Sequence, residues 1–266
     1  MTAMLIEPGE FARGCNAIIF DCRFSLADPE AGRESYEREH VPGAHYLDLN
    51  RDLAGPLGEH GGRHPLPDPA VFAATLARFG VGADSDVVAY DDSRLAFAAR
   101  LWWLMRALGY RPPRLLNGGY EGFLKAGGQP ETGVPPVQSR EPMPVGDYAG
   151  YCDIDGLRDL QAGGALLVDS REPRRYEGLE EPIDPVAGHI PGAINRPWQG
   201  VTTADSNVLG TAELQSHWGD ALDAGQLVVY CGSGVTACVN LFSLALSGRE
   251  DATLYAGSWS DWCSYL

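Results

Sequence analysis

Short apolar runs alternate with stretches of helical periodicity along this chain. The runs VVAY at 87–90 and LVVY at 227–230 contain no charged or amide side chain, which is typical of strands covered on both faces of a parallel sheet. The apolar residues of LAFAARLWWLMRALG at 95–109 recur at helical spacing up to a terminal glycine, and 236–248 repeats both features. Strand, turn and helix in succession predict an α/β fold with a largely parallel sheet.

The chain contains the same landmarks twice, in the same order. An apolar run that ends in Asp-x-Arg occurs as IIFDCR at 18–23 and as LLVDSR at 166–171, and the turn HVPGA at 40–44 returns as HIPGA at 189–193. VVAYD likewise matches LVVYC, and LLNGG matches LYAGS. Because the offsets between these pairs are nearly constant, we predict one fold of about 120–130 residues, duplicated in tandem.

A segment rich in glycine and proline separates the two halves. It opens with GGQP at 127–130 and contains Pro135, Pro136, Pro142 and Pro144, so it can hold neither a helix nor a central strand. It is therefore interpreted as an extended linker. The predicted organisation is a domain at 1–128, a linker at 129–147 and a second domain at 148–266.

Acidic residues dominate the charge balance of this 266-residue chain. Asp and Glu number 36 against 20 Lys and Arg, which gives a formal net charge of −16. Because such a surface repels phosphate backbones and anionic lipid, we expect no nucleic-acid binding and no membrane binding. For the same reason, an anionic substrate would need a local cluster of cations at its binding site. No apolar stretch approaches a transmembrane length, and the first residues lack the basic and apolar regions of a signal peptide.

Six cysteines are scattered along the chain without any C-x-x-C pair. A disulfide framework and a zinc site are both poor interpretations of that pattern. We therefore expect reduced thiols in a cytoplasmic protein, with no metal and no cofactor, and ask whether one thiol is chemically active.

Cys231 occupies the position where open α/β sheets place their ligands. It follows the apolar run at 227–230 and precedes a turn with two glycines, after which helical periodicity begins. The glycines allow backbone N–H groups to turn inward as an anion nest, and the start of the helix adds partial positive charge. These groups favour a thiolate, so we predict a reactive thiol. The alternative is that Cys231 is a small buried apolar residue.

These features together resemble a known family. The paired halves, CGSGVTAC at 231–238, GHIPGA at 188–193 and YAGSWSDW at 255–262 are similar to two-domain rhodanese-type sulfurtransferases, over nearly the whole chain. The loop CGSGVT most resembles 3-mercaptopyruvate sulfurtransferases, whereas thiosulfate-specific members more often carry cations in this loop. The resemblance implies two tandem rhodanese-like domains, each a mostly parallel sheet flanked by helices.

The resemblance also implies a chemistry. Cys231 would attack the outer sulfur of 3-mercaptopyruvate or thiosulfate and carry it as a persulfide to cyanide, a thiol or thioredoxin, without a cofactor. The first half has Asp91 where the second has Cys231, and would be an inactive domain that supplies one wall of the cleft. The backbone amides that would cradle the sulfur anion belong to Gly232, Ser233, Gly234, Val235 and Thr236.

Three further residues are implied in binding the donor. Arg175 lies where the family keeps a substrate arginine, and its planar fork suits a carboxylate; the alternative is that it pairs with an acid of 177–181. His64 matches a family position near the cleft, where it could relay a proton to Ser233. Arg63 beside it could add positive charge. The alternative for His64 is an exposed turn residue on a loop of glycine and proline.

One position departs from the family pattern. The mercaptopyruvate enzymes usually hold a second arginine nine residues after the first, and this chain has Asp184 there. The change removes a cation and adds an anion. It leaves the donor open between 3-mercaptopyruvate and thiosulfate, although the neutral loop favours an α-keto acid over the thiosulfate dianion.

Two other functions compete with sulfur transfer. Cysteine phosphatases and arsenate reductases use Cys-x5-Arg because the arginine clamps a dianionic oxyanion, and the corresponding position here is Ala237. A noncatalytic rhodanese-like module that binds partners or senses redox state would keep the fold and lose the thiol. This chain instead keeps Cys231 within an intact glycine-rich loop.

Overall fold

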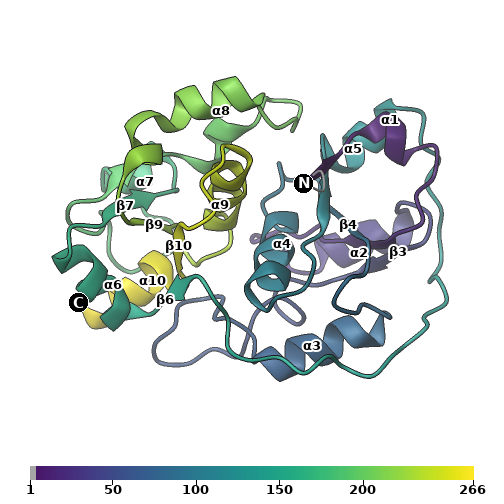
Figure 1. Ribbon diagram of the computed structural model, residues 1–266, viewed down its shortest axis with the longest axis horizontal. Helices are drawn as coiled ribbons and strands as arrows, with labels where there is room; N and C mark the ends of the chain where they lie inside the picture. The colour runs from purple at the N-terminus through teal and green to yellow at the C-terminus, as the bar shows by residue number, and fades with distance from the viewer. Residues whose placement is uncertain (1–3) are drawn as a thin grey trace. The chain divides into compact units, whose positions relative to one another are not determined.

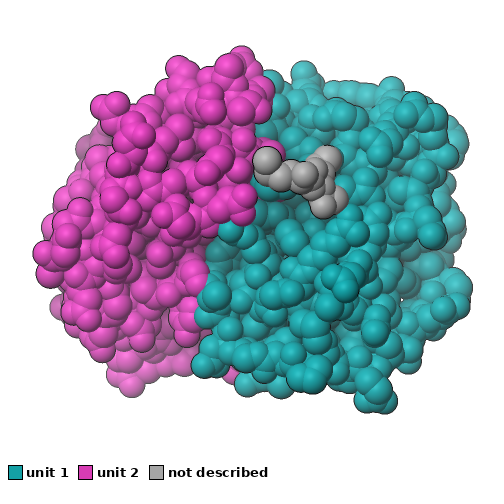
Figure 2. Space-filling view, viewed as in Figure 1, with its two compact units in different colours: residues 1–54, 67–149, 202–208 teal, residues 55–66, 150–201, 209–266 magenta. Residues whose placement is uncertain are grey.

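The computed structural model describes residues 4–266 and divides the chain into two compact units. Unit 1 comprises the chain up to Ala54 together with 67–149 and 202–208, and unit 2 comprises 55–66, 150–201 and 209–266 (Figure 2). Each unit thus includes one short segment whose sequence neighbours belong to the other unit. Within the described part of the chain, no helix is long and apolar enough to cross a bilayer.

Unit 1 is built on a five-stranded sheet with the strand order β1-β5-β4-β2-β3, and all its strand pairs are parallel. Figure 1 labels β3 and β4 of this sheet and the helices α1 to α5 of the same unit. The predicted strand at 87–90 is the central strand β4, and each of its residues is buried. The strands are β1 (Leu5–Ile6), β2 (Ile18–Asp21), β3 (Ala44–Tyr46), β4 (Val87–Tyr90) and β5 (Arg114–Leu116). The helices are α1 (Pro8–Phe11), α2 (Ala31–Arg38), α3 (Pro69–Arg78), α4 (Ala98–Ala107) and α5 (Gly119–Lys125).

Unit 2 repeats this topology. Its five strands are also all parallel, in the equivalent order β6-β10-β9-β7-β8, and the predicted strand at 227–230 is again central. The strands are β6 (Tyr151–Cys152), β7 (Leu166–Asp169), β8 (Ile194–Asn195), β9 (Leu227–Tyr230) and β10 (Thr253–Tyr255). The α-helices are α6 (Ile154–Ala162), α7 (Pro173–Tyr176), α8 (Thr211–Trp218), α9 (Ala237–Leu246) and α10 (Ser258–Trp262), and short 3-10 helices occupy η1 (Trp198–Val201), η2 (Gly219–Asp223) and η3 (Cys263–Tyr265). The predicted α/β fold of two tandem parallel sheets is confirmed.

The two helices predicted from apolar periodicity form with slightly shorter bounds than expected. In unit 1, α4 ends before Gly109, which adopts a φ of 79°. In unit 2, α9 ends before Gly248, whose φ is 93°. Both glycines end their helices in the left-handed conformation, as the sequence predicts.

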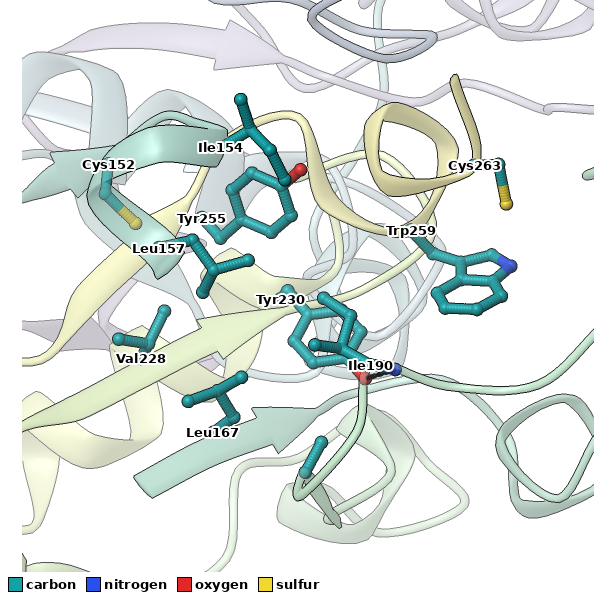
Figure 3. Close-up of a cluster of buried hydrophobic side chains, with 11 residues drawn as sticks. Cys152, Ile154, Leu157, Leu167, Ile190, Val228, Tyr230, Tyr255, Trp259 and Cys263 are labelled. Carbon is teal, nitrogen blue, oxygen red and sulfur yellow. Dashed lines mark hydrogen bonds between the residues drawn. The ribbon is translucent and has the colours of Figure 1, made fainter. Parts of the chain in front are cut away.

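Apolar side chains on the sheet and its helices form the core of unit 2 (Figure 3). Tyr230 of β9 lies in this core, and its hydroxyl accepts a hydrogen bond from the Ile190 amide at 3.1 Å. Tyr90 of β4 makes the matching contact in unit 1 with the Val41 amide, also at 3.1 Å. The duplication therefore extends to the hydrogen bonds that fix the H-x-P-G-A turn to the central strand of each sheet. Because β9 is anchored in this way, the residue after it has a defined position.

Candidate active site

Cys231 is the first residue after β9, at the carboxyl end of the central strand of unit 2. Its amide donates to the Ser258 hydroxyl at 3.1 Å, and its carbonyl accepts from the Trp259 amide at 3.0 Å. These bonds tie the residue to the start of α10, and only 2% of it is exposed. The YAGSWSDW motif of the sequence thus holds the backbone of the cysteine.

The loop from Cys231 to α9 needs glycine at position 234. Gly234 has a φ of 76°, and a Cβ there would collide with the backbone oxygen of Ala256. The turn made possible by this glycine leaves backbone donors available. Among the described residues, none accepts a hydrogen bond from the amides of Gly232, Ser233, Val235 or Thr236. A loop with several free N–H groups before a helix is suited to hold an anion.

The matching loop of unit 1 contains an anion of its own. The Asp91 carboxylate accepts hydrogen bonds of 2.8–3.0 Å from the amides of Ser93, Leu95, Phe97 and Ala98. Burial raises the pKa of Asp91 to about 6, and the amide bonds oppose that shift. The first loop is therefore an anion nest filled by its own side chain.

The segment 55–66 belongs to unit 2 and brings Arg63 and His64 to the Cys231 loop. His64 is 6% exposed, and its Nδ1 lies 2.7 Å from the Ser233 hydroxyl. The alternative of an exposed turn histidine is therefore wrong. The segment is fastened to α10, since the Gly61 amide donates to Asp261 at 2.6 Å and the Arg63 amide donates to the Ser260 hydroxyl at 3.1 Å.

Two guanidinium groups lie over Gly232. A Cβ built on this glycine would be 3.0 Å from Arg63 Nη2 and 3.5 Å from Arg175 Nη1. Burial lowers the pKa of Arg63, the charge of Cys231 opposes this shift, and the charge of Arg175 adds to it. The structure thus brings together five of the residues singled out in the sequence: Cys231, Ser233, His64, Arg63 and Arg175.

Arg175 is held by two buried acids. Its Nη2 donates to Glu181 at 2.7 Å and to Asp184 at 3.0 Å, and its Nε donates to Glu181 at 3.2 Å. The alternative that Arg175 pairs with an acid of 177–181 is therefore realised. Its Nη1, however, donates no hydrogen bond within residues 4–266 and remains available above Gly232.

Other residues with notable side chains have structural roles. Arg171 donates hydrogen bonds from Nε and Nη2 to the Asp169 carboxylate, and its Nη2 also donates to the Gly188 carbonyl at 2.6 Å. Arg23 donates to the Asp21 carboxylate in the same way in unit 1. The turn histidines stack on a tyrosine in both units: His40 on Tyr36 and His189 on Tyr176. Their recurrence in both halves indicates a role in the fold.

In the described chain, no group of three or more His, Cys, Asp or Glu is arranged to hold a metal ion, and all six cysteines are free thiols.

Sequence reasoning missed one residue that shapes the site, Asp261, and named another, Glu181, only as one of the acids at 177–181. Asp261 accepts from the Gly61 amide and from the Tyr255 hydroxyl at 2.7 Å, and it fixes the segment that carries Arg63. Glu181 is 4% exposed in its side chain and bridges Arg171 and Arg175. Both carry a weak signal in the sequence, because Asp261 lies within YAGSWSDW and Glu181 falls between two arginines and the unusual Asp184.

Comparison with known proteins identifies a family and its relatives. The family model of the rhodanese-like domain matches residues 8–126 and again 154–265. A Pseudomonas aeruginosa protein named probable 3-mercaptopyruvate sulfurtransferase is 43% identical over 98% of this chain and 92% of its own length. The thiosulfate sulfurtransferase of Cricetulus griseus is 34% identical over 92% of this chain and 84% of its own. The structure of a 3-mercaptopyruvate sulfurtransferase from Leishmania major matches with a TM-score of 0.87 and 30% identity, over 99% of this chain and 75% of that one. The names of these relatives divide between two sulfur donors.

Proposed function

The chain belongs to the rhodanese-like domain family and is an enzyme of the sulfurtransferase class, and from this premise we propose that it carries sulfane sulfur as a persulfide on Cys231. The observation that supports this proposal is a set of hydrogen-bond donors beside Cys231 that have no acceptor among the described residues: loop amides, Arg63 Nη2 and Arg175 Nη1. Four loop amides and the guanidinium groups of Arg63 and Arg175 all lie at the end of β9. Such N–H groups stabilise a thiolate, a persulfide anion and the anionic group of the sulfur donor.

The proposed first step transfers the outer sulfur of the donor. With 3-mercaptopyruvate, the Cys231 thiolate forms an S–S bond while the C–S bond breaks, and the electron pair passes to the methylene carbon. The proton of the donor thiol ends on that carbon, so pyruvate leaves and the enzyme carries a persulfide anion. His64 and Ser233, 2.7 Å apart, are proposed to move this proton. Thiosulfate would react without any proton movement, because sulfite leaves with the electron pair of the broken S–S bond.

The second step regenerates the thiolate. A nucleophile attacks the outer persulfide sulfur, the S–S bond breaks, and its electron pair returns to Cys231. Cyanide would leave as thiocyanate, and a thiol or a thioredoxin would leave as its own persulfide. We propose 3-mercaptopyruvate as the preferred donor because the loop CGSGVT carries no charged residue. A cytoplasmic location is proposed because all six thiols are free.

The experiment that tests Cys231 is a measurement of intact mass. The protein is incubated with 3-mercaptopyruvate or thiosulfate, freed of the donor, and weighed before and after cyanide is added. We expect a gain of one sulfur atom, about 32 Da, that cyanide removes. Cys231→Ser should gain nothing, whereas the matched control Cys15→Ser, whose thiol lies in unit 1, should behave as the wild type. No gain in the wild type would favour a noncatalytic module, and an equal gain in Cys231→Ser would assign the chemistry to another thiol.

A further inference from the structure

Asp184 stands where an arginine is expected, and its contacts show what it does instead. Its side chain is 2% exposed. One carboxylate oxygen accepts from Arg63 Nη1, and the other accepts from Arg175 Nη2 at 3.0 Å. A single acid therefore bridges two guanidinium groups whose residues come from distant parts of the sequence.

The bridge occupies one edge of each guanidinium and leaves the other edge available. Within the described residues, neither Arg63 Nη2 nor Arg175 Nη1 donates a hydrogen bond. Both atoms approach Gly232, at 3.0 and 3.5 Å from the position of a Cβ, and the acid-paired Arg175 Nη2 lies beside them at 3.6 Å. The acid that replaces an expected cation at position 184 is thus itself paired with a different cation, Arg63.

The charges around this bridge balance. Three guanidinium groups face three carboxylates in one connected set of ion pairs. The members of this charge cluster are Arg63, Arg171, Arg175, Asp169, Glu181 and Asp184. No cation of the cluster is in excess, so an additional negative charge on a donor that approaches Cys231 finds no spare guanidinium charge in the cluster to offset its repulsion by the acids.

We propose that Asp184 is a positioning residue that holds Arg63 and Arg175 side by side for one carboxylate, and that its charge selects donors with a single negative charge over dianions. This inference rests on the proposed sulfur transfer, and it assigns the choice of donor to a contact outside the cysteine loop. A carboxylate accepts one hydrogen bond from each free guanidinium edge, as a forked pair. A dianion gains the same two bonds, but the balanced cluster offers no spare cation for its second charge, which the Asp184 carboxylate repels.

The test compares donors rather than overall rates. For wild type and Asp184→Asn we would measure kcat and KM with 3-mercaptopyruvate and with thiosulfate at low ionic strength. Removing one negative charge should raise the ratio of the thiosulfate to the mercaptopyruvate kcat/KM by about tenfold, mainly through the thiosulfate KM. Asp184→Glu keeps the charge and should return the ratio toward the wild-type value. Glu180→Gln is the control, because Glu180 lies in the same loop but pairs with the exposed Arg174.

A ratio in Asp184→Asn within about threefold of the wild type would overturn the proposal, as would an equal rise in Glu180→Gln. A second measurement does not depend on turnover. On Cys231→Ser, with and without Asp184→Asn, calorimetry would compare the binding of pyruvate and of sulfate. The Asn variant should favour sulfate by about tenfold relative to pyruvate, and an unchanged preference would overturn the proposal. If this preference shifts while the wild type acquires no sulfur, the proposed function fails, and what stands is the preference for singly charged anions that Asp184 gives the site.

Discussion

Arg63 offers the sharpest test of how the site binds its donor. Its Nη2 faces Gly232 and has no partner among residues 4–266, so it is free to donate one charge-assisted hydrogen bond to the donor. Such a bond contributes about 1.5–3 kcal/mol. We therefore expect Arg63→Ala to lower kcat/KM for 3-mercaptopyruvate by about 10- to 150-fold, mostly through KM.

The loss should reflect binding and not a weakened fold. The Arg63 side chain is 30% exposed, and Asp184 keeps its bond to Arg175 when Arg63 is removed. The free energy of unfolding should fall by only about 1 kcal/mol. Removing Arg175 would be less informative, because that change takes a guanidinium partner from two buried acids at once, Glu181 and Asp184.

The assay follows pyruvate release by coupled oxidation of NADH, with a thiol as acceptor, and unfolding by urea is measured on the same samples. Arg174→Ala is the control: this arginine is 67% exposed and pairs with Glu180, away from the loop. A kcat/KM for Arg63→Ala within about threefold of the wild type would refute the reasoning, as would an equal loss in Arg174→Ala.

Two further predictions concern protons. Ser233→Ala should lower kcat by about 100-fold with 3-mercaptopyruvate, whose sulfur transfer requires a proton to reach carbon, and change it little with thiosulfate; equal losses would argue against the His64–Ser233 relay. Burial raises the pKa of Asp91 to about 6, above its ordinary value of 3.8, so the folded state binds this proton more tightly than the unfolded state. Stability from this group is therefore lost as the pH rises, by about 2 kcal/mol between pH 4 and pH 7. Urea unfolding should show this decrease in the wild type and not in Asp91→Asn, and parallel curves would contradict it.

Local features of the fold could be predicted from the sequence because each depends on a few adjacent residues. The buried strands β4 and β9 follow from uninterrupted apolar runs, and the ends of α4 and α9 follow from Gly109 and Gly248. The duplication could be predicted because both halves contain the same motifs, Asp-x-Arg after a strand and the turn H-x-P-G-A. The two short segments that each unit takes from elsewhere could not be predicted, since nothing local in 55–66 or 202–208 specifies its distant partners.

The candidate site was predictable only in part. Cys231 is marked by its glycine-rich turn, and Arg175 and His64 by family position, but their roles remain predictions. The pairing of Asp184 with Arg63 joins residues 121 positions apart in the sequence. A sequence shows that a charge has changed sign at one position, but not which distant charge comes to compensate it.

The attachment of the segment 55–66 has a consequence for how this duplicated chain can evolve. Arg63 and His64 are encoded in the first half of the gene but lie beside the Cys231 loop of the second unit. A carboxyl-terminal half released by gene fission would keep Cys231 but lack this guanidinium and this imidazole. The first half therefore supplies part of the surroundings of Cys231 although it has Asp91 at its own matching position.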